Sequence, residues 1–364
     1  MATNIGLPSL TISFQAAAQQ AANRSKRGYV GVFVRDSKAQ GVHQISSAAL
    51  IPAELGQANQ DYLNRTFTGS DRGVPSKVVA VVISPGTEDT AALAAGISLI
   101  EGMTLDYIAP PPDVTPAEKQ LLEAWVKARR ESYYTEKLVE PEAGTPDHMG
   151  IINFDEESLA EGSTTFTAAE YASRIAGILA GIPMGMSSTY AALPELTSVT
   201  VRTAAEQAAA VNEGKLILVH DGQRAKIVRG VNSLTSVPAT GKEDWSKIKI
   251  VETMDLITYY LRTTIQDEYL GRYANTYDNK CILLTAITEY LSYLEGQGVL
   301  SAGESWAEID LEAQEAWMKA QGVETAGMTQ QEVLEYQTGS WVFIRCGGRL
   351  VDAMEDFQVH FNNL

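Results

Sequence analysis

Histidine and cysteine side chains often carry acid–base, nucleophilic or metal chemistry near neutral pH, and this chain has four histidines and two cysteines. The best placed is His220, which ends the apolar segment 215–220 and is followed by Asp221 and Gly222. A base at the carboxyl end of a strand suits an α/β enzyme. Asp-Gly is also a hairpin signal, and a second strand pattern follows it directly. The segment therefore predicts a turn between two strands, with a catalytic base as the alternative.

The other candidates for chemistry lack partners at the required spacing. No nucleotide-binding loop, nucleophile elbow or zinc-binding helix motif occurs, and no acidic series has the spacing of a calcium loop. Cys281 and Cys346 have no CxxC and no histidine at ligand spacing, which predicts packing residues. Gly177, Gly181 and Gly185 repeat every four residues, which indicates helix packing and not a dinucleotide loop. We therefore predict no catalytic residue, no cofactor and no metal.

The composition is that of a globular protein with a strong negative charge. Of 364 residues, 45% are hydrophobic and 20% are charged, and the length suits about two to three domains. The net charge of −17 disfavours bulk binding to nucleic acid. Two local basic clusters, 24–27 and 224–229, are expected to be solvated surface. The apolar run 78–83 is too short to insert into a membrane as a spanning helix, and residues 1–20 lack a signal-peptide pattern.

Strand and helix patterns alternate from Gly28 to about Gly230. Helix starts are marked by Thr-x-x-Glu motifs, in which the two side chains can satisfy each other's backbone N–H groups. The motifs begin at Thr115, Thr167, Thr203 and Thr329. Strands are predicted at 29–35, 77–84, 104–109, 151–154, 198–202, 215–220 and 225–229. This alternation predicts an α/β sandwich whose sheet is at least partly parallel.

The pattern becomes helical from about Ile248. Two apolar stripes step by three and four residues and predict two long helices. The stripes are Val251, Met254, Ile257, Leu261 and Ile265, and then Cys281, Leu284, Ile287, Leu291 and Leu294. A turn is predicted at 271–279, which makes the two helices an antiparallel pair. Helices around Trp306 and Trp317 and a short strand at 341–346 follow. The chain therefore predicts a mixed α/β fold with a helix-rich carboxyl-terminal part that holds a small sheet.

Each end of the chain carries an amphipathic strand pattern. The apolar positions are Leu10, Ile12 and Phe14 within 9–15, and Phe357, Val359 and Phe361 within 357–362. Neither strand has a hairpin partner beside it, and an unpaired strand lacks ladder hydrogen bonds worth about 0.5–1.5 kcal/mol each. The two strands either pair within one subunit or add to sheets of neighbouring subunits. Because head-to-tail donation generates rings or helical arrays, we expect a fibre or tube.

Four short motifs lie in order along the chain, at residues 6–14, 24–28, 277–280 and 351–357. Their sequences and their placement at both ends resemble those of contractile phage tail sheath proteins from Gram-positive hosts. The likeness covers the whole chain and extends to the sheaths of phage-tail-like bacteriocins such as diffocins.

The resemblance implies a structural protein and not an enzyme. Sheath subunits of this family form hexameric rings that stack helically around an inner tail tube, between a baseplate and a terminator or collar, without contacting nucleic acid directly. Their terminal strands add to small sheets on neighbouring subunits, and 9–15 and 357–362 match those strands by position. Contraction of this contractile injection system drives the tube through the target envelope. Such particles assemble in the bacterial cytoplasm and are released by lysis.

The resemblance also predicts how the chain is divided. The expected parts are an amino-terminal arm at 1–27, an outer α/β domain at 28–200, an inner carboxyl-terminal domain at 201–348 and a carboxyl-terminal arm at 349–364. The candidate acceptor strand is 341–346, which carries Trp341, Phe343 and Arg345.

Two alternatives belong to other classes of protein. One is a cytoplasmic α/β enzyme with a site near His220 and Asp221, for which a soluble monomer would lose turnover in a His220→Ala variant. The other is a surface-layer or capsid-like protein that uses the same strand exchange, which electron microscopy would show as a flat lattice and not as six-fold hollow tubes.

Overall fold

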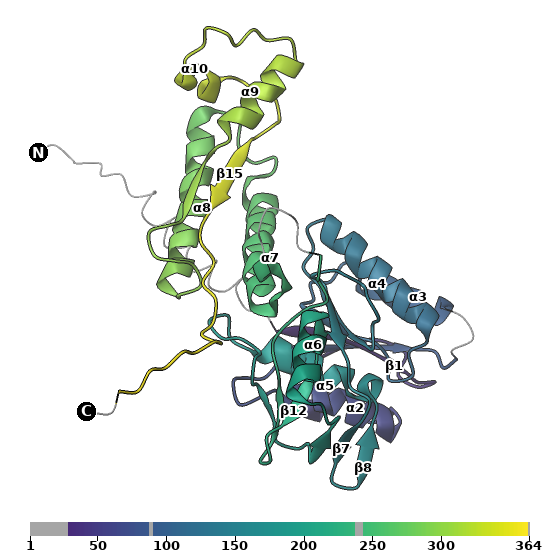
Figure 1. The fold of residues 1–364 in the computed structure, drawn as a ribbon. Helices are drawn as coiled ribbons and strands as arrows, with labels where there is room; N and C mark the ends of the chain where they lie inside the picture. Colours follow the sequence, from purple (N-terminus) through teal and green to yellow (C-terminus); the bar gives the residue numbers. More distant parts are fainter. Residues whose placement is uncertain (1–27, 87–89, 237–242, 363–364) are drawn as a thin grey trace, which may run out of the picture. The chain divides into compact units, whose positions relative to one another are not determined.

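The computed structural model of the chain describes residues 28–86, 90–236 and 243–362, and these form two compact units. The α/β unit consists of residues up to 255 together with 353–362, and the helical unit consists of 256–352. Figure 1 shows residues 28–255 of the α/β unit in purple to green and its residues 353–362 in yellow, whereas the helical unit runs from green to yellow. The expected domain boundary at residue 200 falls inside the α/β unit, because residues 215–216 complete one edge of its main sheet.

The main sheet has seven strands in the order β11-β6-β5-β4-β1-β3-β2. Their bounds are β1 Tyr29–Arg35, β2 Gly41–Ile45, β3 Lys77–Ile83, β4 Tyr107–Ala109, β5 Lys137–Pro141, β6 Ile151–Phe154 and β11 Lys215–Leu216. Every neighbouring pair is parallel except β2 and β3, which are antiparallel. Since β3 and β4 lie on opposite sides of β1, the chain reverses its winding direction there, as in doubly wound folds.

Helices cover both faces of this sheet. The helices are α2 Gln57–Thr68 and α5 Ala168–Gly181 for one face, and α3 Ala91–Ile100 and α4 Pro116–Glu131 for the other. Along β1, Val32 packs in the core that contains residues of α2 and α5, whereas Phe33 packs in the core that contains residues of α3 and α4. The alternation arises because successive strand residues point to opposite faces. The predicted α/β sandwich with an at least partly parallel sheet is therefore confirmed, and all but one of the strand pairs in the main sheet are parallel.

The rest of the α/β unit forms smaller elements around the sheet. These are η1 Ala48–Leu50, β7 Leu159–Glu161, β8 Thr164–Phe166, β9 Ala192–Leu193, β10 Ser198–Val199, α6 Ala204–Asn212, β12 Leu218–His220, β13 Ala225–Ile227 and η2 Glu243–Ser246. The predicted strand 215–220 is two strands in different sheets, β11 beside β6 and β12 beside β13. The predicted strand 198–202 is shorter than expected, because only 198–199 pair, with β7.

All four predicted helix starts carry a complete capping box. Thr115, Thr167, Thr203 and Thr329 each accept a hydrogen bond from the backbone N–H three residues later, and the glutamate there accepts from the threonine N–H. The four predictions are confirmed, because both partners of a capping box lie within one helical turn and can be recognised from the sequence.

A buried cluster of charges holds the start of α7 Ile248–Thr264 within the α/β unit. The amine of Lys137, on β5, is fully buried and lies 2.8 Å from a carboxylate oxygen of Asp255 and 2.9 Å from one of Glu252. The guanidinium of Arg130 approaches Asp255 to 2.7 Å. Because buried charges without partners are strongly destabilising, these pairs fix the first turns of α7 against β5 and α4.

The helical unit contains the rest of α7, a π-helical turn η3 Ile265–Tyr269, and α8 Tyr277–Gly296. Tyr260 of α7 stacks on Tyr290 of α8 with 3.4 Å between ring centroids, so the two helices pack together there. The predicted turn 271–279 ends earlier than expected, because Thr276 caps α8 by accepting from the N–H of Asn279. The predicted stripe of α8 is also rotated at its start, where Lys280 and Leu283 are buried.

A two-stranded antiparallel sheet and two short helices complete the helical unit. They are β14 Trp306–Ile309, α9 Leu311–Ala320, α10 Gln330–Glu335 and β15 Ile344–Gly347. The prediction of a helix around Trp306 is wrong, because residues 306–309 pair with β15 and alternate between exposed and more buried side chains. The helix predicted around Trp317 is α9.

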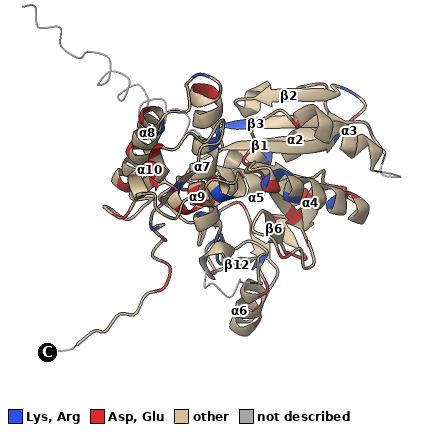
Figure 2. Ribbon diagram, turned by 90° about the horizontal axis from the view of Figure 1, so that it is seen from above, with Lys and Arg blue, Asp and Glu red and all other residues tan. Residues whose placement is uncertain are grey.

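Acidic side chains outnumber basic ones in the helical unit. Residues 256–352 contain fourteen acidic and six basic side chains, a net charge of −8. Within them, 304–335 contain eight acidic side chains and one basic side chain. Figure 2 shows these acidic residues on α9, α10 and the adjoining turns.

Candidate subunit-contact site

At the switch point of the main sheet, where doubly wound enzymes bind ligands, Arg35 forms ion pairs with two carboxylates. Arg35 ends β1 and donates to Asp113 over 2.9 Å, to Glu118 over 2.5 Å and to the carbonyl oxygen of Gly86 over 2.8 Å. Its side chain is only 6% exposed, and Glu118 is also the capping residue of α4. These charges satisfy one another, so the cluster acts as structural support at the start of α4.

His220 and Asp221 form a hairpin turn between β12 and β13, so the predicted turn is confirmed. A ring nitrogen of His220 accepts from the N–H of Gly222 over 3.1 Å, and Asp221 accepts from the N–H groups of Gln223 and Arg224. The ion pair with Lys226 and these N–H groups hold the pKa of the Asp221 carboxyl well below its usual range. Both side chains therefore serve the turn.

Helix packing explains the glycines at four-residue spacing. A Cβ on Gly177 would overlap the carbonyl oxygen of Thr66 on α2, and one on Gly181 would lie 2.8 Å from the carbonyl oxygen of Gly73. Gly185 lies beyond the end of α5 and has open space around it. The first two glycines let α5 approach its neighbours closely.

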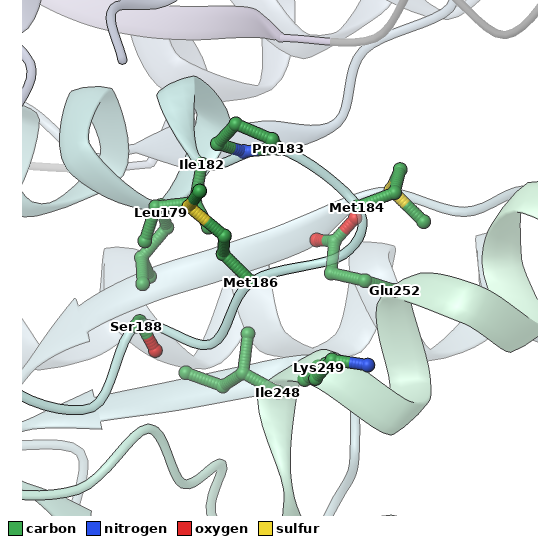
Figure 3. Close-up of a pocket in the computed structure, with 9 residues that line it drawn as sticks. All are labelled: Leu179, Ile182, Pro183, Met184, Met186, Ser188, Ile248, Lys249 and Glu252. Atoms are coloured by element: carbon green, nitrogen blue, oxygen red, sulfur yellow. The ribbon is translucent and has the colours of Figure 1, made fainter. Parts of the chain in front are cut away.

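A small pocket lies at the end of α5 (Figure 3). Its walls are mainly the apolar side chains of the end of α5 and of the following loop, including Met184 and Met186, and the start of α7 adds Lys249 and Glu252. Within the described ranges, the chain has no group of three or more His, Cys, Asp or Glu side chains that could hold a metal ion. In the same residues, no helix is long and apolar enough to cross a membrane.

The carboxyl-terminal segment 357–362 is described by the structure, forms no strand there and exposes its apolar side chains. The exposed fractions are 75% for Phe357, 83% for Val359 and 89% for Phe361. Figure 1 shows this segment running out to the carboxyl terminus. A strand that adds to another sheet typically carries apolar side chains at every second position. The three exposed side chains of this segment have that spacing. The matching positions at the other end, Leu10, Ile12 and Phe14, lie outside the described residues.

The sheet of β14 and β15 offers edges for a further strand. Each of its two strands has a partner on one side only among the described residues. Unpaired strand edges present rows of N–H and C=O groups that can pair with another chain. The sheet is extended by hydrogen bonds from Ser301 to Arg349 and from Val351 to Val299.

The predicted acceptor strand at 341–346 begins later than expected. Trp341 and Phe343 precede β15, and their carbonyl oxygens already accept hydrogen bonds, from Asn275 and Asp310 respectively. Their rings stack at 6.2 Å with an interplanar angle of 11°. Arg345 lies within β15 and its Nε donates to Glu308 on β14 over 2.6 Å. The strand edge itself is therefore 344–347, with the Trp341 ring exposed beside it.

The residues that hold the base of the carboxyl-terminal segment are not evident from the sequence. Glu355 contacts Ser187, Thr189 and Arg229, and Arg229 also contacts Asp356. Arg229 belongs to the basic cluster 224–229, which is therefore not simply solvated surface. The only signals in the sequence are the acidic pair 355–356 and the basic cluster 224–229, and nothing connects them because they lie more than 120 residues apart.

The chain is similar to known proteins over most of its length. Residues 240–362 match the family described as the phage tail sheath C-terminal domain. A tail sheath protein of Clostridium phage phiCD119 is 33% identical over 355 residues, which cover 97% of this chain and 98% of that protein.

Two solved structures share the fold. A sheath tail protein from Listeria innocua has a TM-score of 0.69 and 15% identity, covering 94% of this chain and 99% of its own. The helical sheath of the anti-feeding prophage in its contracted state also has a TM-score of 0.69, with 16% identity, covering 92% of this chain and 93% of its own.

Proposed function

The chain belongs to the phage tail sheath protein family, and from this premise we propose that its terminal segments link copies of it into a contractile tube. It is a structural subunit of the tail sheath of a phage or of a related contractile system, and its matched relatives are structural proteins and not enzymes. The expected partners are further copies of the chain, the inner tail tube, and the baseplate and terminator or collar proteins.

One observation carries the proposal for the carboxyl-terminal end. Phe357, Val359 and Phe361 are exposed at alternate positions of a segment that has no strand partner among the described residues. Burying three such side chains against a neighbour contributes several kcal/mol, at about 25 cal/mol per Å² of apolar surface. Strand pairing adds backbone hydrogen bonds. The sheet of β14 and β15 in the next copy is the proposed acceptor, and 9–15 is proposed as the second donated strand.

Repetition of these contacts gives the proposed mechanism. When each copy donates a strand to the next, the contacts are not used up in a two-fold dimer. Hexameric rings stacked in a helix allow every copy both to donate and to accept a strand. Paired terminal strands act as tethers while the subunits rotate and move outward, so the tube shortens without separating. The energy stored in the extended assembly then drives the inner tube through the target envelope. Assembly in the bacterial cytoplasm and release by lysis complete the proposal.

Variants of the apolar face and of the polar face of the carboxyl-terminal segment can be compared in their ability to form tubes. We expect a variant with Phe357, Val359 and Phe361 changed to threonine to fold normally and to form no tubes, as seen by negative-stain electron microscopy. The matched control changes Gln358, His360 and Asn362 to alanine and should form normal tubes. Deletion of residues 1–15 should likewise give folded subunits that do not polymerise. Tubes of normal length from the threonine variant or from the deletion would contradict the proposed strand donation.

A further inference from the structure

Within the carboxyl-terminal segment, the exposure of the side chains rises sharply between Glu355 and Phe357. The side chain of Glu355 is only 6% exposed, whereas that of Phe357 is 75% exposed. Glu355 is bound by the α/β unit, to which residues 353–362 belong. The contact therefore sits directly before the apolar side chains that the segment presents.

Three side chains of the α/β unit surround the Glu355 carboxylate, and we name them the Glu355 socket: Ser187, Thr189 and Arg229. One carboxylate oxygen accepts from the Ser187 hydroxyl over 2.5 Å and from the Thr189 hydroxyl over 2.7 Å. The other accepts from Nε of Arg229 over 3.2 Å. Nη2 of Arg229 also donates to Asp356 over 2.5 Å. Charge-assisted hydrogen bonds of this kind are stronger than bonds between neutral groups.

The socket is shaped by the α/β unit itself. The hydroxyl oxygen of Ser187 accepts from the N–H of Thr189 over 3.1 Å, and that of Thr189 accepts from the N–H of Gly230 over 3.0 Å. With each oxygen occupied in this way, its hydrogen is available to the carboxylate. Arg72 binds the carbonyl oxygens of Ser187 and Thr189 and so fixes their loop. These supporting contacts are made by residues outside the carboxyl-terminal segment.

We propose that the Glu355 socket anchors the carboxyl-terminal segment to its own subunit and so sets how far the donated strand can reach. From Glu355 to Phe361 the chain has six residues, which span about 20 Å when extended. Measured from Val351, whose N–H bonds to the carbonyl oxygen of Val299, the ten residues to Phe361 span about 34 Å when extended. The shorter tether excludes more distant acceptors and raises the effective concentration at the nearest one. This inference rests on the proposed strand donation.

Limited proteolysis of the unassembled full-length subunit tests the anchor directly. Chymotrypsin cleaves after Phe357 only when the neighbouring residues, including Glu355, are free to extend into the protease, so cleavage reports the released population. We expect Glu355→Gln to release the peptide that begins at Gln358 at an initial rate about ten times that of the parent. The substitution removes the negative charge that strengthens the hydrogen bonds in the socket. Arg229→Gln should act in the same direction. The control is Glu131→Gln, which changes an exposed carboxylate at the end of α4 and should leave the rate unchanged.

Two results would overturn the anchor. One is cleavage of Glu355→Gln and Arg229→Gln at the parental rate. The other is protection that appears only at protein concentrations where subunits associate, because the socket would then hold the segment of another copy.

A second measurement tests the consequence for assembly. Tubes of Glu355→Gln examined by electron microscopy should form but vary more in diameter and helical order than parental tubes, whereas parental order in the variant would overturn the role in reach. Normal tubes from a subunit lacking residues 357–364 would refute strand donation instead. The proteolysis result would still decide whether the socket binds Glu355.

Discussion

At the scale of single residues, Glu140 is a carboxyl group held neutral by its surroundings. It lies on β5 with a fully buried position in the main sheet, and one of its oxygens has no hydrogen-bond partner within the described chain. Burial, together with repulsion from Glu123, raises the pKa of Glu140 to about 8, although Lys119 and Lys127 nearby oppose the rise. The folded protein therefore keeps a proton that the unfolded chain releases near pH 4.5.

This proton gives the stability a defined pH dependence. Because the folded state binds more protons than the unfolded state between about pH 4.5 and 8, the free energy of unfolding falls as the pH rises through this window. Glutamine has nearly the same size and shape as glutamate but does not ionise. At pH 9 the melting temperature of Glu140→Gln should therefore exceed that of the parent by about 4 °C or more. Thermal unfolding from pH 5 to pH 9 measures this. An unchanged pH profile in Glu140→Gln, with Glu131→Gln as the surface control, would show that another group dominates.

Residue-level features that depend on near neighbours in the sequence were predictable, and those that depend on distant partners were not. The capping box at Thr115 and the turn at His220 are each complete within a few residues. The Glu355 socket joins loops and a terminal segment that the sequence separates by more than 120 positions. No local pattern could specify it, because its members are an ordinary serine, threonine and arginine.

At the scale of elements, the close approach of α2 and α5 depends on one glycine. A Cβ at position 177 would overlap the Thr66 carbonyl of α2, and that carbonyl belongs to a helix backbone that cannot move alone. We expect Gly177→Ala to lower the free energy of unfolding by about 2 kcal/mol, because overpacking forces the two helices apart.

The same repeat supplies the control for this prediction. Gly185→Ala meets no atom within 4 Å of its new Cβ and should change stability by less than about 0.5 kcal/mol. Urea denaturation of both variants, followed by circular dichroism, gives the comparison. Equal stability of the two variants would mean that α2 and α5 can separate without loss, and that the spacing of the glycines has no packing role.

Strands were predicted well where they are wholly apolar and poorly where tertiary pairing decides them. β1 and β6 match their predicted bounds because buried parallel strands are continuous apolar runs. β5 was not predicted, since it begins with Lys137 and contains Glu140, whose burial depends on α7 and α4. β14 was mistaken for helix because four residues are too few to show a period, and only its pairing with β15 defines it.

At the scale of the whole molecule, assembly places copies of a strongly acidic chain side by side. Each chain has a net charge of −17, and eight acidic side chains but one basic side chain lie within 304–335, which includes β14 and adjoins the proposed acceptor edge. In the proposed strand donation, apolar burial and backbone pairing must therefore hold the segment against electrostatic repulsion between copies. Ionic strength changes the balance between this attraction and the electrostatic repulsion, because salt screens the repulsion but does not weaken the burial of apolar side chains.

Added salt should therefore promote tube formation. Raising the ionic strength from about 0.01 M to about 0.15 M shortens the screening length from about 30 Å to about 8 Å, so the lowest protein concentration at which tubes form should fall several-fold. Sedimentation of tubes across a salt series measures this. A variant with Glu312, Glu324 and Glu335 changed to glutamine removes three charges from the acidic region and should depend less on salt. If salt instead dispersed the tubes of both proteins, ion pairs between copies would be the main contacts, and the apolar strands would be secondary to them.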